Sequence, residues 1–280
     1  MAISAKDVKK LRDQTGAGMM DCKKALTEAN GDYDEAVSIL RKKGAKLAGK
    51  RADRDAKEGV VIAQTSSNRN KGVIVRLSCE TDFVAKNEDF VNFAKEIADI
   101  ALKNMPADKD ALLNTKYNNE LTVGEKITEQ VGVIGEKVEV ADYQKIDTKA
   151  GEGQVIPYIH AGYRAGVLIA LNQEGPQYQE AGKNVAMQVA AMRPVALNKD
   201  GVDSSVVEKE IEIGKEQARA EGKPEAMLEK IARGKLNKFF KERTLLAQAY
   251  VKDSKQSVEK YLQSQHKDLT VTEFKHVELG

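Results

Sequence analysis

Short amphipathic segments separated by glycine-containing breaks fill the first part of the chain. In residues 1–44 the apolar side chains recur three or four positions apart, as at Val8 and Leu11, which is typical of helices that bury one face. Glycine often ends a helix, so Gly31 and Gly44 are expected to end the second and third helices. The expected helices are one before residue 15, one over residues 20–30 and one from Asp32 to Gly44. Because this three-helix unit is too small to bury a large core, we expect it to act as a docking module.

The middle of the chain contains a repeat of continuous apolar runs. Residues 72–77 (GVIVRL) are similar to residues 166–171 (GVLIAL), and another strand-like run precedes each, at 59–65 and at 154–159. Each pair of runs predicts a β-hairpin, and an amphipathic helix that ends near a proline follows each hairpin. The repeat therefore predicts two related α+β subdomains, each a small antiparallel sheet covered by helices.

Two long periodic segments interrupt the second subdomain. Residues 203–221 and 225–243 have helical spacing, and only the sequence Gly-Lys-Pro separates them, so they predict an antiparallel helical hairpin. A helix near 254–265 and a strand near 269–277 follow, and we expect the strand to return to the second sheet. The role of the hairpin stays open among a structural arm, a surface for a partner and a dimer contact.

These patterns place the chain in the α+β class and divide it into three parts. The predicted division is a three-helix domain with a basic linker over 1–55, an N-terminal core subdomain over 56–148 and a C-terminal core subdomain over 149–280 with the hairpin 203–243 inserted.

Composition narrows the environment and the partners. The chain has 45 Lys and Arg against 43 Asp and Glu, a net charge of +2, which gives no sign of a nucleic-acid ligand. The cysteines, Cys22 and Cys79, fall in different predicted units, so we expect no disulfide framework and a reducing compartment. No apolar run reaches transmembrane length and no signal-peptide core begins the chain. We expect a cytoplasmic protein with no membrane partner.

The sequence does not contain the residue spacings of known catalytic and metal-binding motifs. Residues 132–137 are glycine-rich but lack the spacing of a phosphate-binding loop. His160, His266 and His276 are far apart and do not have zinc-ligand spacing. No pair of acids or nucleophile with a base fills the roles of an active site. We therefore expect no catalytic residue, no metal, no cofactor and no stable small-molecule ligand, that is, a protein that is not an enzyme.

One segment distinguishes the two copies of the repeat. Residues 81–87 (TDFVAKN) follow the first hairpin, whereas an ordinary turn at 172–176 follows the second. Because only one copy has this segment, the fold itself does not require it, and a functional loop is favoured. Asp82 beside Phe83 indicates that the loop exposes an aromatic side chain.

Three stretches resemble the bacterial elongation factor Ts family. They are residues 11–30 around Leu11-Arg12 and TGAGMMDCKKAL, residues 81–86 (TDFVAK) and residues 134–136 (Ile-Gly-Glu), and a weaker likeness covers most of the chain. The resemblance implies an N-terminal UBA-like (ubiquitin-associated-like) domain, two related core subdomains and a helical hairpin. It also implies a guanine-nucleotide exchange factor for the GTPase elongation factor Tu.

The resemblance also implies roles for individual residues. A first group reaches the Mg²⁺ and phosphate region of the GTPase, where Phe83 wedges between partner side chains: Thr81, Asp82, Phe83 and Val84. A second group contacts the partner elsewhere: Arg12, Met19, Met20, Ile134, Gly135 and His160. Some family members continue into a C-terminal helix that contacts the partner, and we expect that contact to be absent here.

Two other functions stay open. Residues 41–57 carry eight Lys and Arg without an interleaved aromatic, which is typical of a solvated helix face or linker. Together with the basic end of the hairpin, they offer an alternative, an RNA- or ribosome-associated binding protein. Steep salt dependence of RNA binding would distinguish it. An adaptor role for residues 1–44 is a third hypothesis.

Overall fold

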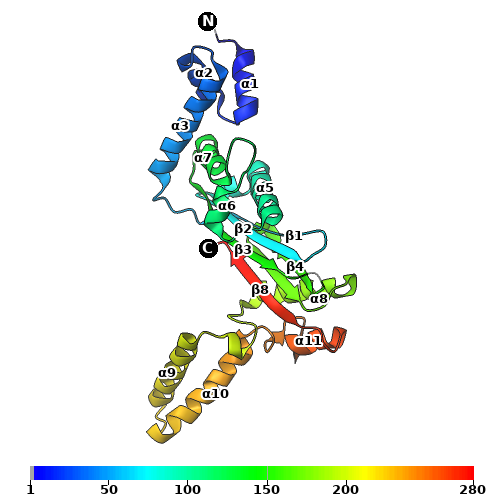
Figure 1. The fold of residues 1–280 in the computed structure, drawn as a ribbon. Helices are drawn as coiled ribbons and strands as arrows, with labels where there is room; N and C mark the ends of the chain where they lie inside the picture. The colour runs from blue at the N-terminus through cyan, green and yellow to red at the C-terminus, as the bar shows by residue number, and fades with distance from the viewer. Residues whose placement is uncertain (1–2, 150) are drawn as a thin grey trace.

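The computed structural model describes residues 3–149 and 151–280. The molecule is elongated, with three helices at one end, two small sheets in the middle and a helical hairpin at the other end (Figure 1). Helices and antiparallel strands share the central units, so the predicted α+β class is confirmed. No helix within these residues is both long enough and apolar enough to cross a membrane.

The N-terminal unit consists of α1 (Ala5–Thr15), α2 (Met19–Glu28) and α3 (Tyr33–Arg51). A capping box between Ser4 and Asp7 begins α1, because the two side chains satisfy free backbone N–H groups at the helix start. The second helix ends two residues earlier than predicted. That the three-helix unit is a UBA-like domain stays a prediction. The side chains of the small core come from all three helices: Val8, Leu11, Cys22, Leu26 and Ala36.

Helix α3 is longer than predicted, because Gly44 does not end it. The helix continues to Arg51, so residues 41–51 are helical and not a linker. Gly44 packs against α7 (Val123–Ile134), where a Cβ added to Gly132 would lie 2.8 Å from the Gly44 Cα. The glycine therefore permits a close approach of two backbones, a role that the sequence does not distinguish from helix termination.

A substitution at this crossing has a measurable consequence. Gly132→Ala and Gly49→Ala both gain helix propensity, but nothing lies within 4 Å of a Cβ at Gly49. We expect Gly132→Ala to have a free energy of unfolding lower than that of Gly49→Ala by about 1–3 kcal/mol, because the new methyl group strains the α3–α7 contact. Urea unfolding of the two variants measures the difference. Equal stability would mean that the helices do not pack this closely.

The first sheet contains β1 (Glu58–Thr65), β2 (Lys71–Cys79) and β3 (Val138–Asp147), antiparallel and in that order. Strand β2 is central and buried on both faces, which explains its continuous apolar run. Its alternate residues pack against helices on one side and against the second sheet on the other. The covering helices are α5 (Glu88–Asn104), α6 (Lys109–Asn114) and α7.

The second sheet has the order β4 (Gln154–Ile159), β5 (Ala165–Leu171) and β8 (Val271–Glu278). The final strand pairs with β5, as predicted. Close approach of the two sheets requires glycine at Gly72, where a Cβ would lie 2.6 Å from Val155 Cγ1. A cluster of buried side chains fills the space between the sheets: Val61, Ala63, Ile74, Ile146, Val155, Leu168, Ala170 and Val277.

The remaining elements surround the second sheet. The helix predicted over 254–265 begins later, at Val258, because the residues before it form strand β7 (Asp253–Ser257), which pairs with β6 (Ala249–Tyr250). The other elements are α8 (Gln179–Met192), α11 (Val258–Gln265) and the 3₁₀ turns η1 (Ala161–Tyr163), η2 (Pro176–Tyr178) and η3 (Lys199–Gly201).

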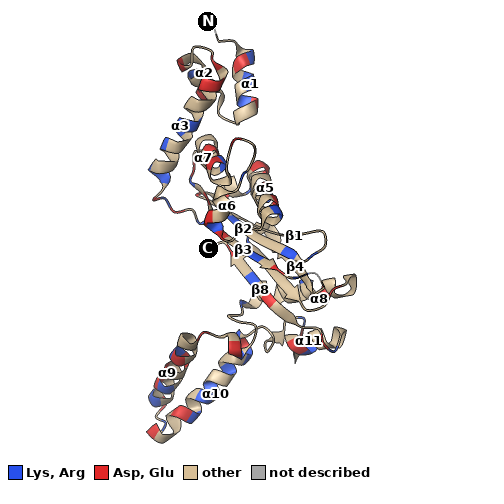
Figure 2. Cartoon of the chain, in the orientation of Figure 1, with Lys and Arg blue, Asp and Glu red and all other residues tan. Residues whose placement is uncertain are grey.

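The helical hairpin consists of α9 (Ser204–Ala220) and α10 (Glu225–Arg243), as predicted. It projects from the second sheet region (Figure 1). Both helices carry acidic and basic residues (Figure 2), and Lys215 forms ion pairs with Glu212 and Glu229. The hairpin thus presents mixed charge and not a single basic face.

Candidate functional site

The segment that distinguishes the two subdomains is a short helix and not the predicted loop. Residues Asp82–Ala85 form the one-turn helix α4 directly after β2. The backbone of Thr81 is extended, and its hydroxyl accepts a hydrogen bond from the Val84 N–H at 3.5 Å. A threonine in this position satisfies a free N–H group at the helix start, so the sequence T-D-F-V begins a helix.

Helix α4 turns one large aromatic side chain into solvent. Phe83 is 84% exposed, whereas Ala85 is buried and Val84 packs against the first core. Most exposed apolar side chains are unremarkable singly, but a phenylalanine this exposed on a turn anchored by its neighbours indicates a contact with another molecule. The prediction that Phe83 is exposed is confirmed.

Asp82 places a charge beside this aromatic ring. Its carboxylate lies 2.6 Å from Lys86 Nζ, one helical turn later. The hydrogen bond from Lys86 lowers the pKa of Asp82 below its ordinary value, so the carboxylate is ionised at neutral pH. The exposed end of α4 therefore presents an apolar ring next to a negative charge.

Cys79 supports α4 from inside. Its thiol is buried and donates to the Thr81 carbonyl oxygen at 3.2 Å. Burial raises the pKa of Cys79 to about 12, so the sulfur stays a neutral thiol and is a poor nucleophile. This agrees with a packing role for Cys79.

A second exposed surface lies on the N-terminal helices. Gly16, with φ +70°, ends α1, and α2 begins at Met19. Met19 is 45% exposed and Met20 is 65% exposed. The Arg12 side chain is about half exposed and pairs with Asp13 at 3.2 Å. Flexible methionine side chains adapt to partner surfaces, and these two are free of the domain core.

The residue pair Ile134-Gly135 ends helix α7. Gly135 has φ +80° and donates its N–H to the Val131 carbonyl, which closes the helix. Ile134 packs in part against the first core. The pair therefore holds the chain as it passes from α7 toward β3.

A cavity of about 720 Å³ brings three predicted segments together. Gly16, which follows α1, Val84 from α4 and Ile134 from α7 all line it. The other lining residues come mainly from α5 and α7: Asn87, Asp89, Phe90, Asn92, Phe93, Glu96, Tyr117, Lys126, Gln130 and Val133.

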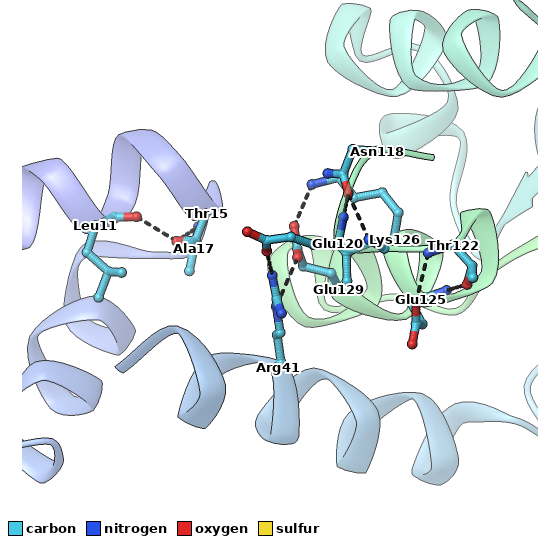
Figure 3. Close-up of polar contacts among 11 residues, drawn as sticks. Leu11, Thr15, Ala17, Arg41, Asn118, Glu120, Thr122, Glu125, Lys126 and Glu129 are labelled. Carbon is cyan, nitrogen blue, oxygen red and sulfur yellow. Dashed lines mark hydrogen bonds and ion pairs between the residues drawn. The ribbon is translucent and has the colours of Figure 1, made fainter. Parts of the chain in front are cut away.

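Ion pairs beside this cavity attach the N-terminal helices to the core. Arg41 on α3 points toward two carboxylates of the core (Figure 3). Its Nη2 lies 2.8 Å from Glu120 Oε2, and its Nε lies 4.0 Å from Glu129 Oε2. These ion pairs and the close α3–α7 contact together set the position of the N-terminal helices, which carry Met19 and Met20, relative to α4.

His160 lies apart from this group. It precedes η1 in the second subdomain, is exposed, and shares a hydrogen bond of 3.0 Å with the Tyr158 hydroxyl. It does not line the cavity that contains Val84 and Ile134. Any partner that contacts both His160 and Phe83 must therefore extend over both subdomains.

Within residues 3–149 and 151–280, no group of three or more His, Cys, Asp and Glu side chains is arranged to hold a metal ion. The exposed chemistry of the site is instead an aromatic ring, two methionines and flanking charges. Aromatic residues and methionine are enriched at protein–protein interfaces relative to the rest of the protein surface.

Comparison with known proteins identifies the family. The family model described as Elongation factor TS matches residues 80–280. Proteins named Elongation factor Ts from Christiangramia forsetii and Cytophaga hutchinsonii are each 52% identical to the chain, over 278 and 279 residues, and 99% of both chains is covered. The chain belongs to the elongation factor Ts family. A third relative of the same name, from Chlorobaculum tepidum, is 45% identical over 287 residues and is also covered to 99%.

As a member of the elongation factor Ts family, the protein is a translation elongation factor. The match to the family model includes α4 and Ile134-Gly135 but begins after the N-terminal helices. The full-length relatives extend the likeness to the surface that carries Arg12, Met19 and Met20.

The sequence did not predict the residues whose hydrogen bonds hold the start of α4. Glu136 accepts hydrogen bonds from Thr81, and Glu80 accepts one from Arg51. The signal that was missed is strand β3, whose first residues bring Glu136 beside the end of β2. Without that strand the closeness of Glu80 and Glu136 is not visible in the sequence.

Proposed function

We propose that this protein is a guanine-nucleotide exchange factor that binds elongation factor Tu and accelerates release of its GDP. The observation that carries the proposal is Phe83, which is 84% exposed on the one-turn helix α4, whose Ala85 is buried. Membership in the elongation factor Ts family supports the same function. The factor acts through contact between proteins and forms no covalent bond with a substrate.

In the proposed mechanism, α4 approaches the nucleotide site of the GTPase. Phe83 inserts between side chains of the partner, and the segment from Thr81 to Val84 disturbs the Mg²⁺ bound there. Because Mg²⁺ neutralises the charge of the phosphates, its displacement weakens the binding of GDP. The charge of Asp82, held by Lys86, faces the same region.

The energy required points to several contacts acting together. An acceleration of about 10⁴-fold requires a reduction of about 5.5 kcal/mol in the barrier to release. One buried aromatic hot spot supplies about 2–4 kcal/mol, so Phe83 is insufficient alone. In this proposal Ile134-Gly135 and His160 supply the other contact that favours release, and Arg12, Met19 and Met20 on the N-terminal surface bind the factor to the partner.

A binding measurement tests the proposal. Nucleotide and factor must weaken each other's binding to the GTPase by the same ratio. Titration of the factor into elongation factor Tu, once without nucleotide and once with excess GDP and Mg²⁺, should give much tighter binding without nucleotide. Equal affinity in the two states would exclude exchange by this mechanism.

The alternative of RNA binding receives less support from the charges. Several basic residues at the hairpin are paired with acids: Lys235 with Glu221, Arg233 with Glu229, and Lys238 with Glu242. Neutralised pairs release few counterions when a nucleic acid binds. A steep fall of RNA affinity with rising salt would support the alternative, and weak binding that does not depend on salt would not.

A further inference from the structure

Two glutamates link the end of β2 to the start of β3, directly before α4. Each glutamate side chain accepts hydrogen bonds from the opposite segment. Glu136 Oε2 accepts from the backbone N–H of Glu80 at 3.1 Å and of Thr81 at 3.0 Å, and Glu136 Oε1 accepts from the Thr81 hydroxyl at 2.6 Å. In return, Glu80 Oε1 accepts from the Lys137 N–H at 2.6 Å. We call this arrangement the Glu80/Glu136 clamp. It holds the two strands together beyond their last paired residues.

The clamp is also joined to the N-terminal domain. Arg51, the last residue of α3, donates to Glu80 Oε1 at 2.6 Å, and both side chains are mostly covered. The Lys137 N–H, followed by Arg51, lowers the pKa of Glu80, so Glu80 is ionised at neutral pH. Hydrogen bonds to a charged acceptor are shorter and stronger than those between neutral groups.

Helix α4 depends on such external support. A helix of four residues has no stability of its own, because forming the first turn costs more than its hydrogen bonds return. Phe83 adds no packing, since it is almost fully exposed. The orientation of the ring is therefore set by the backbone on either side of it.

Thr81 connects the clamp to α4. Its hydroxyl donates to Glu136 and accepts from the Val84 N–H. A hydroxyl has one proton to donate, and Glu136 fixes where that proton points. A lone pair is then directed at the first turn of α4.

We propose that Glu136 is a positioning residue for nucleotide exchange, which orders the segment from Thr81 to Val84 before the partner arrives. Ordering in advance removes a cost that binding would otherwise carry. This inference rests on the proposed function, since it assigns Glu136 a part in that activity.

The test compares Glu136→Ala, Glu136→Gln and a matched control, Glu139→Ala. Glu139 lies three residues after Glu136, in β3, and its side chain pairs with Lys137 Nζ at 3.3 Å and does not bond to Thr81. We expect Glu136→Ala to lower the maximal rate of stimulated GDP release about tenfold, by loss of hydrogen bonds to a charged group. The factor concentration that gives half of the maximal rate should change little, because the N-terminal contact remains. Glu136→Gln should lose less, since its carbonyl oxygen still accepts from backbone N–H groups, and Glu139→Ala should match the wild type.

Two further readouts separate positioning from general damage. Amide hydrogen exchange at Thr81 and Val84 should be faster in Glu136→Ala, while the thermal transition of the whole protein is retained. In a Phe83→Ala background, Glu136→Ala should change the rate by less than about twofold, because residues acting through one contact are not additive. If Glu136→Ala does not fold, Glu136→Gln and Thr81→Val carry the test, and we expect both to lower the maximal rate.

Three results would overturn the inference. They are a wild-type rate in the Glu136 variants, an equal loss with and without Phe83, and a raised half-saturating concentration with an unchanged maximum. If the wild-type protein itself fails to accelerate release, the proposed function is wrong, and amide exchange alone then reports whether the clamp orders α4.

Discussion

Replacement of Phe83 by alanine is expected to lower the maximal rate of factor-stimulated GDP release by about 30- to 900-fold. This range corresponds to the loss of about 2–4 kcal/mol, typical of a buried aromatic hot spot. The ring contacts little within its own chain, because it is 84% exposed. The free energy of unfolding should therefore stay within about 0.5 kcal/mol of the wild-type value. Stopped-flow release of a fluorescent GDP and urea unfolding measure the two quantities.

A control variant separates the wedge from a general loss of apolar surface. Met227 on the hairpin is also exposed, and it lies far along the chain from α4. Met227→Ala should release GDP at the wild-type rate. If Phe83→Ala also retained the wild-type rate, nucleotide exchange would not depend on the aromatic ring, and the wedge assignment would be wrong.

Replacement of both Met19 and Met20 by alanine is expected to have a different signature. The half-saturating factor concentration should rise about 30-fold, as expected from the loss of about 2 kcal/mol of buried apolar contact. The maximal rate should stay close to that of the wild type, because α4 is unchanged. Both methionines are exposed at the start of α2 and contribute little to the core of their domain. A titration of factor in the GDP-release assay gives both parameters.

The matched control replaces two other exposed methionines, Met192 and Met227. This double variant should titrate like the wild type. A fall in the maximal rate of the Met19 and Met20 variant, with no shift in half-saturation, would mean that the N-terminal surface takes part in the release step and not only in binding.

Much of the fold follows from periodicity in the sequence. Strands β2 and β5 were predicted because a continuous apolar run bounded by glycine fits a strand buried on both faces. The helical hairpin was predicted because two long periodic segments are joined by a very short turn. Such local patterns predict an element well where its side chains are almost completely buried.

The sequence was less informative where a residue has a long-range role. The local sequence predicts a helix end at Gly44, but this glycine lies inside α3 and packs against Gly132, far away in the chain. Strand β3 was missed because its residues are only partly buried and alternate weakly. Without β3, the contact between Glu136 and Thr81 had no basis in the sequence.

In the candidate site, too, features set by the local sequence were predicted and features set by distant residues were not. The exposure of Phe83 was predicted from the neighbouring Asp82, the surface role of the two methionines came from the family resemblance, and all three side chains are exposed. The one-turn helix α4 was predicted as a loop, because the cap formed by Thr81 depends on a hydrogen bond to Glu136, which is far away in the chain. The local sequence contains the cap, but not the partner that holds it.

Release of labelled GDP from elongation factor Tu, with and without this protein, tests the central claim most directly. Unlabelled GDP in excess prevents rebinding, and the measurement is repeated with Mg²⁺ chelated. The account predicts a release rate that rises steeply with factor and saturates, and a smaller further acceleration once Mg²⁺ has been removed. An unchanged release rate in the presence of folded factor would contradict it.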